Sequence, residues 1–275
     1  MDLNHTEFRR TVLVLAIGAL VTAGCQKMPI NEGTVFLPAD SAGWLEPGDL
    51  VIGFAGEGQS RAYPIRALSP IEVLNDTIDG IPVVVTWCPL SATGAIFSSR
   101  TQGEAKRFRF HPDLYHMNLL FEDAETGSVW SQLSLRAVDG EEEGKELILV
   151  PTVQTTWSEW LRTHPETTVL RSDWGRGRFS YRLPADGSPP GARAERELAL
   201  VVIRGQERRV YPISDLSRAA GPVEDTIAGE PLTVHFNPEG PTAFATDLAG
   251  TLLPSVIMYW KYLEDFFPDS EIWEP

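Results

Sequence analysis

The sequence predicts an α+β protein in which antiparallel strands dominate and two internally duplicated halves pack as one body. Two similar segments carry this prediction. Residues 61–89 read RAYPIRALSPIEVLNDTIDGIPVVVTWCP, and residues 209–238 read RVYPISDLSRAAGPVEDTIAGEPLTVHFNP. Tyr63 matches Tyr211, and both segments contain Asp-Thr-Ile-x-Gly-x-Pro. Because so long a match rarely arises by chance, an internal duplication explains it best.

Each half is predicted to begin with an apolar strand, at residues 51–54 and 200–203, followed by a polar turn and a second strand. Pro64 and Pro212 mark the end of that second strand, because proline has no N–H to donate to a strand ladder. Two short strands joined by a polar turn predict an antiparallel hairpin at the start of each half.

A short helix or helical turn is expected after each Tyr-Pro, over residues 65–74 and 213–220. A second hairpin follows it. Asp79 and Gly80 lie between β-branched residues, which favours a two-residue turn with positive φ. Gly229 holds the same place in the second half.

Both halves are predicted to close on a helix. Thr156 and Glu159 have the spacing of a capping box, and Pro165 ends the helix. Pro268 holds the position of Pro165, which makes the first half about 45 residues longer. The insertion lies at about residues 90–151.

These observations give the predicted boundaries. A first repeat covers residues 49–170, a linker or exposed loop rich in Arg, Gly and Pro covers 171–197, and a second repeat covers 198–275. A segment rich in Gly, Pro and Ser at 25–48 is expected to be a tether that leads into the first repeat.

The N-terminus is typical of an export signal. Two arginines precede an apolar stretch at residues 11–21, which is too short to span a bilayer. The Thr-Ala-Gly that follows ends at Cys25, and this pattern resembles the lipobox of bacterial lipoproteins. The resemblance implies cleavage of residues 1–24, a lipid on Cys25 and a place in the cell envelope, at the outer membrane if the cell has one. A plain signal peptide remains the alternative.

Charge and cysteine content limit the function classes. The formal net charge of −15 argues against nucleic acid and anionic lipid as electrostatic partners. Lipidation of Cys25 would leave Cys88 as the only thiol, so no intramolecular disulfide is expected. A single thiol in an exported protein is either buried and inert or chemically used.

The candidate site residues are those at which the two halves differ. Cys88 in the first half corresponds to Asn237 in the second, the insertion brings His111 and His116, and His235 lies two residues before Asn237. If the strand ends of the two halves converge, a thiolate and imidazoles could bind copper or zinc. The alternatives are an inert, buried Cys88 and a nucleophilic Cys88 activated by histidine.

Several motifs resemble the bacterial domain-of-unknown-function family 3179, mainly over residues 50–170. These motifs are Arg-Ala-Tyr-Pro at 61–64, Asn-Asp-Thr at 75–77, Thr-Trp-Cys-Pro-Leu-Ser at 86–91, Glu-Thr-Gly-Ser-Val-Trp-Ser-Gln at 125–132 and Thr-Trp-x-x-Trp at 156–160. The resemblance implies an exported or envelope protein and brings no established activity. Family members commonly have a second cysteine where this chain has Ser91, so a Cys-x-x-Cys disulfide or two-thiolate site is not available here.

Two hypotheses follow from the sequence. The first is a non-catalytic, lipid-anchored envelope protein that serves as a binding or structural module, with a ligand cleft between the repeats. The second is a metal-binding or thiol-dependent redox protein centred on Cys88 with His111, His116 and His235. The lipid anchor is the only partner contact that the sequence indicates, and nucleic acid is not expected.

Overall fold

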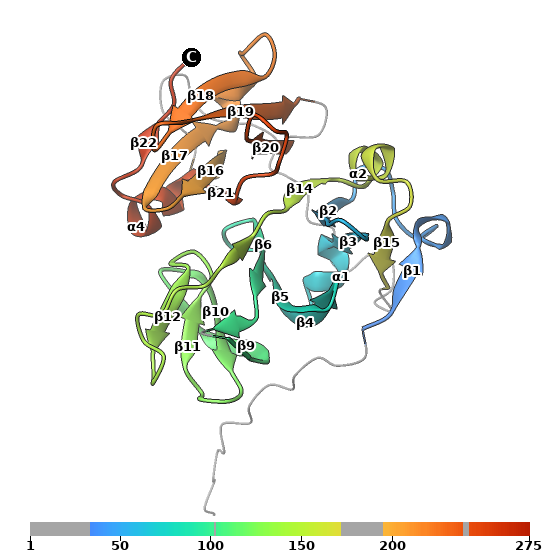
Figure 1. Cartoon of the computed structure of the whole chain (residues 1–275), viewed down its shortest axis with the longest axis vertical. Helices are drawn as coiled ribbons and strands as arrows, with labels where there is room; N and C mark the ends of the chain where they lie inside the picture. The colour runs from blue at the N-terminus through green and yellow to red at the C-terminus, as the bar shows by residue number, and fades with distance from the viewer. Residues whose placement is uncertain (1–33, 102, 172–194, 239–241) are drawn as a thin grey trace, which may run out of the picture.

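The computed structural model describes residues 34–101, 103–171, 195–238 and 242–275. Cys25, the expected signal segment 1–24 and most of the expected linker therefore lie outside the described residues. The described part of the chain is mainly β, with 50% of its residues in strands and 12% in helices, and its mostly antiparallel sheets form a ring that resembles a five-bladed β-propeller (Figure 1). In the described chain, no helix has the length and apolar character needed to cross a membrane.

The α+β expectation needs correction, because the helices are too short to form a layer of their own. Among the described residues, three α-helices have four residues each, and the longest has seven. They are α1 (Ile65–Leu68), α2 (Trp157–Thr163), α3 (Ile213–Leu216) and α4 (Leu263–Phe266), with two 3₁₀ turns, η1 (Ala39–Ser41) and η2 (Trp260–Tyr262). Thr156 caps α2 by accepting the N–H of Glu159, as the capping box predicts.

Two sheets share one arrangement. Each has an antiparallel hairpin at its centre, an antiparallel strand on one side and a parallel strand on the other. The first has the order β1 (Phe36–Pro38), β15 (Thr168–Leu170), β3 (Ser60–Pro64), β2 (Leu50–Ala55), β14 (Val153–Thr156). The second has the order β21 (Ser255–Tyr259), β16 (Leu198–Arg204), β17 (Glu207–Pro212), β22 (Glu271–Ile272).

A second pair of sheets is built on the Asp-Thr-Ile-x-Gly-x-Pro segments. Their central hairpins turn with positive φ at both middle residues, Asp79-Gly80 and Ala228-Gly229, as the sequence predicts. One sheet has the order β13 (Leu149–Val150), β6 (Thr93–Ser98), β5 (Ile81–Cys88), β4 (Val73–Ile78). The other has the order β18 (Val223–Ile227), β19 (Glu230–Asn237), β20 (Thr242–Thr246).

The extra residues of the first half form a sheet of their own beside β4 and β5. Phe108 makes edge-to-face contacts with both Phe121 and Trp130 in this sheet, which fixes its core. Its order is β12 (Arg136–Asp139), β11 (Val129–Ser131), β10 (Asn118–Asp123), β9 (Phe108–Tyr115), and a small hairpin of β7 (Arg100–Thr101) and β8 (Glu104–Ala105) precedes it.

The segment expected to be a tether is part of the body where it is described. Phe36 in β1 pairs with Leu170 in β15. Ala42 and Leu45 are buried against Trp157 and other residues under α2. The Val35 carbonyl also accepts the N–H of Arg171, so any free tether must end before Val35.

A partly buried triad joins the first two sheets of the first half. Asp76 in β4 accepts hydrogen bonds of 2.5 Å from Arg61 Nη1 and 2.5 Å from Tyr63 Oη, both in β3. Burial and the neighbouring carboxylate raise the pKa of Tyr63 above its ordinary value, so the phenol stays a donor. The triad explains why the Arg-x-Tyr-Pro and Asp-Thr motifs occur together.

The second half contains the same triad. Asp225 in β18 accepts from Tyr211 Oη at 2.9 Å and pairs with Arg209 Nε at 3.1 Å. Arg209 also pairs with Glu271 at 2.5 Å. The residues that the two halves share are therefore structural in both places.

Candidate functional site

Cys88 lies at the end of β5 and is sealed from solvent, with 1% of its surface exposed. Its sulfur is hydrogen-bonded to the Ser91 side chain and to backbone groups of Leu90, Ser91 and Leu119. Burial raises the pKa of the Cys88 thiol, and these hydrogen bonds offset the effect only in part. Cys88 is therefore a neutral thiol, which is a poor nucleophile and metal ligand.

A buried hydrogen-bond network surrounds this turn. Asn118 Nδ2 donates to Ser91 Oγ at 2.9 Å and to Gln132 Oε1 at 3.0 Å. Gln132 Nε2 in turn donates to Thr86 Oγ1 at 2.9 Å. Two of the sequence motifs, 86–91 and 125–132, thus meet in one place. Each of these side chains has a hydrogen-bond partner, so the network holds the insertion on β5, and this role accounts for the two motifs.

Aromatic residues of the second half cover the same turn. Tyr262 Oη donates to the Leu90 carbonyl at 3.0 Å, and the Tyr259 N–H donates to the Ser91 carbonyl at 2.9 Å. Tyr262 is 3% exposed. The Cys88 end of the first half is consequently filled by the insertion on one side and by Tyr262 on the other.

The histidines are held in separate environments. His111 Nδ1 accepts the N–H of Asp113 at 3.3 Å. His116, at the tip of β9 and β10, is half exposed and lies 3.3 Å from Asp265. His235 bonds to Thr246 Oγ1 at 3.0 Å, and burial lowers its pKa.

The expectation that these side chains share a copper or zinc ion with Cys88 is therefore corrected. Within the described ranges, no group of three or more His, Cys, Asp or Glu residues could hold a metal ion. None of the hydrogen-bond partners named above for the Cys88 sulfur is a histidine, so the structure gives no activating base for this thiol.

Asn237, the counterpart of Cys88, has a different environment. It lines a cavity of about 580 Å³ between the first half and the second. The walls come from β14 and α2 of the first half and from β20 of the second, strands that lie side by side. The lining is mainly apolar and includes Phe54, Pro151, Val153, Trp160, Phe244 and Leu252.

The cavity also has polar lining residues, which are Thr155, Glu159, Arg162, Thr163, His164, Asn237, Thr242, Thr246 and Thr251. Thr242 Oγ1 donates to Thr155 Oγ1 at 2.9 Å, and both residues are buried. This bond uses one of the two hydroxyl hydrogens and leaves the other for a ligand. His164 stacks on Trp160 with ring centroids 3.9 Å apart, and burial lowers the pKa of its imidazole, so it is neutral at pH 7. Glu159 is neutralised by Arg162 at 2.7 Å.

The open cavity and the filled Cys88 turn occupy equivalent places. β14 of the first half lies beside β20, and β21 of the second half lies beside β6. When Pro165 is matched with Pro268, Glu159 corresponds to Tyr262. Tyr262 fills its interface, whereas Glu159 turns to Arg162 and leaves space. Side-chain volume at one position thus contributes to the difference between the two interfaces.

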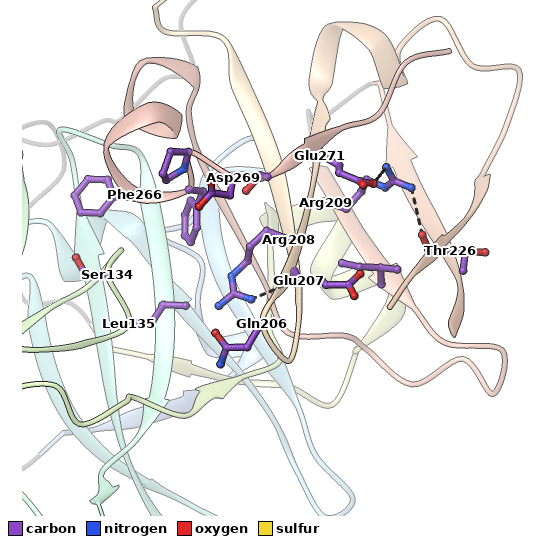
Figure 2. Close-up of a pocket in the computed structure, with 14 residues that line it drawn as sticks. Ser134, Leu135, Gln206, Glu207, Arg208, Arg209, Thr226, Phe266, Asp269 and Glu271 are labelled. Carbon is purple, nitrogen blue, oxygen red and sulfur yellow. Dashed lines mark hydrogen bonds and ion pairs between the residues drawn. The ribbon is translucent and has the colours of Figure 1, made fainter. Parts of the chain in front are cut away.

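A second hollow lies between the insertion and the second half (Figure 2). It measures about 330 Å³ and is bordered by Ser134 and Leu135 on one side and by the β16–β17 hairpin on the other. Arg208 extends from β17 into this space. Neither Cys88 nor any of the candidate histidines borders it.

Comparison with known proteins gives a family. A family model described as a protein of unknown function (DUF3179) matches residues 27–251 of the chain. The chain belongs to the DUF3179 family. No curated protein and no solved structure matches it.

In this DUF3179 protein Asn237 is the one cavity residue among the predicted site residues that the structure describes, and for Trp160 the sequence favours a place in the core over one in a groove. Thr155, Trp160 and His164 lie in the Thr-Trp-x-x-Trp segment and just beyond it, where they look like helix capping and core residues. In the sequence, the feature that points to this cavity is the difference between the two halves at Cys88 and Asn237. Asn237 lines this cavity, whereas the sequence singled it out only as the counterpart of Cys88.

Proposed function

We propose that this DUF3179 protein is a lipid-anchored envelope protein whose duplicated body binds a small, neutral, apolar ligand between its two halves. The observation that carries the proposal is the cavity of about 580 Å³. Its volume falls within the roughly 300–1,000 Å³ range of small-molecule sites, and such sites are commonly apolar with a few placed polar groups.

The lining defines the ligand further. Phe54, His164 and Phe244 are only half-buried, so their rings are available to contact a ligand. The remaining hydroxyl hydrogen of the Thr155–Thr242 pair offers one donor to an oxygen atom. The charges of Glu159 and Arg162 are already paired. These features favour a planar aromatic molecule that carries a carbonyl group and no net charge.

The anchor part of the proposal rests on the lipobox-like sequence before Cys25. Val35 already bonds to the body through its carbonyl, which accepts the N–H of Arg171, so about 10 residues separate it from Cys25. Such a segment spans at most roughly 40 Å when fully extended. The body would then remain close to the membrane surface, where apolar ligands are concentrated.

A neutral naphthalene ketone tests the site. The protein is the chain from residue 25 with Cys25→Ser, which keeps every described residue. We expect 6-propionyl-2-(dimethylamino)naphthalene to bind saturably, with emission shifted to the blue. Its analogue without the propionyl group should bind about fivefold more weakly, because it lacks the hydrogen-bond acceptor.

The blocking variant is Glu159→Tyr, which places the second half's residue in the cavity. It should weaken binding by at least about tenfold, since the ring occupies the ligand's space. Ser158→Tyr is the matched control, because Ser158 is exposed on the same helix and does not line the cavity. Equal affinity of the two variants would show that the probe binds elsewhere.

A further inference from the structure

The groove in Figure 2 contains Arg208, whose guanidinium donates to other described residues through Nη1 alone. Two hollows of about 330 Å³ each meet at Arg208, and both are bordered by Ser134, Leu135 and Gln206. The groove is formed where the insertion faces the β16–β17 hairpin of the second half. It shares no lining residue with the cavity between β14 and β20.

The hairpin itself fixes the orientation of Arg208. Its Nη1 donates to the Gly205 carbonyl at 2.8 Å and to the Glu207 carbonyl at 3.0 Å. These bonds use both hydrogens on Nη1. A guanidinium has five N–H donors, so three remain on Nε and Nη2. Those three form the edge that binds a carboxylate through two parallel bonds.

Among the described residues, no acceptor binds that edge. Over the described residues, Nε and Nη2 of Arg208 make no hydrogen bond, and no carboxylate lies within 4.0 Å of the guanidinium. The neighbouring Arg209 differs, because it pairs with both Asp225 and Glu271. Burial lowers the pKa of Arg208, and the more distant Glu146 offsets this only in part. An anion at the open edge would therefore relieve an uncompensated, half-buried charge.

The two ends of the groove differ in character. Glu207, Asp269 and Glu271 border one end, and their carboxylates would repel an anion, so a ligand held at Arg208 would extend toward the other end. The other end is mixed in character: the apolar residues Leu135, Leu147, Ile148, Leu149, Ile203 and Pro254 border it together with Arg136, Glu146 and Gln206. Ile148 is 64% exposed there, which is high for so large an apolar side chain. Ile203 lies directly opposite Arg208 in the hairpin, so a chain leaving Arg208 would meet it first.

We propose that Arg208 anchors a second binding site, which takes a monocarboxylate carried on an apolar chain. The carboxylate accepts from Nε and Nη2, and the chain lies along Leu135, Ile148 and Ile203. This site is independent of the ligand proposed for the cavity between the halves. Its chemistry fits both a fatty acid and the C-terminus of a peptide with apolar last residues.

Octanoate and octan-1-ol distinguish the charge from the chain. In calorimetric titrations of the chain from residue 25 with Cys25→Ser, octanoate should bind and octan-1-ol should bind at least about tenfold more weakly. Arg208→Gln should weaken octanoate binding by about tenfold or more. Arg208→Lys should give an intermediate loss, because lysine keeps the charge without the planar fork. Raising the salt concentration should weaken octanoate but not octan-1-ol.

Two further variants make the test decisive. Arg100→Gln removes an exposed arginine that also bonds to a backbone carbonyl, and it should leave octanoate binding unchanged. Ile148→Glu changes only an exposed side chain, and the added charge should weaken octanoate even if Arg208→Gln fails to fold. Equal binding of octanoate and octan-1-ol, or full binding by Ile148→Glu, would overturn the proposal.

A competing peptide identifies the source of the carboxylate. The peptide Gly-Ser-Gly-Val-Leu-Leu with a free C-terminus should displace octanoate if the site receives polypeptide ends, and its C-terminal amide should not. If neither peptide displaces octanoate, a fatty acid is the ligand. Displacement by the amide as well would contradict the role of Arg208.

Discussion

Replacing Asp76 by Ala should lower the free energy of unfolding by about 3–5 kcal/mol, because it removes the shared acceptor of a partly buried triad. Asp76 accepts from Arg61 and Tyr63 at 2.5 Å each. The side chains of Arg61 and Asp76 are 15% and 9% exposed, and Tyr63 is fully buried. Each hydrogen bond to a charged group contributes about 1.5–3 kcal/mol. The variant leaves a phenol and a guanidinium without their acceptor.

The second half provides an internal comparison. Asp225→Ala should cost less, about 2–3 kcal/mol, because its bonds to Tyr211 and Arg209 are longer and solvent is closer. Arg209 also keeps Glu271 as a partner. The expected order is therefore a larger loss for Asp76→Ala than for Asp225→Ala.

Urea denaturation followed by tryptophan fluorescence measures these losses, with Glu224→Ala as control. Glu224 is an exposed neighbour of Asp225 on the same strand, and its loss should change the free energy by no more than about 0.5 kcal/mol. The reasoning fails if Asp76→Ala lies within about 1 kcal/mol of the wild type, or if Asp225→Ala is the more damaging change.

Three further predictions concern other parts of the body. Burial raises the pKa of Glu72 to about 7, so ionisation of this carboxyl group destabilises the folded protein as the pH rises from about 4.5 to 7. In urea titrations, Glu72→Gln should therefore be no more stable than the wild type at pH 4.5 but more stable than the wild type at pH 8. The Cys88 thiol should react with a disulfide reagent at least about a hundredfold more slowly in the folded protein than in urea. Gly53→Ala should cost about 1–3 kcal/mol, because the added Cβ would lie 2.2 Å from the Trp160 ring.

Each of these predictions has a control and a refuting result. For Glu72, a stability difference that does not change with pH would contradict the burial argument. Tyr262→Ala should speed the labelling of Cys88, since Tyr262 covers its turn. Labelling that is fast without this change would show an accessible thiol. Gly43→Ala is the control for Gly53, because no atom lies within 4 Å of its added Cβ, and equal effects of both would refute the clash.

The hairpins and the helix cap could be predicted from the sequence, because turn residues and prolines act locally, but the order of the strands in the sheets could not. The Asp79-Gly80 turn and the Thr156 cap are examples. The role of Asp76 could not be read in this way, since its partners are in another strand and only the three-dimensional arrangement brings them together.

The candidate metal site failed for a related reason. Spacing along the chain does not show which surface a side chain reaches. His111 and His116 belong to the β9–β10 hairpin, whose tip packs against α4 of the second half, while Cys88 lies beneath it. The cavity beside Asn237 depends on the volumes at Glu159 and Tyr262, a tertiary property that no single motif contains.

The most direct test of the central claim is a ¹⁵N NMR titration of the chain with the naphthalene ketone. Binding between the halves predicts that the largest shifts occur at the backbone amides of Thr155, Thr242 and Phe244, which line the cavity. The amides of Cys88 and Ser91, in the filled equivalent place, should not shift. Shifts centred on the Cys88 turn, or no saturable shift at the Thr155–Thr242 pair, would contradict the account.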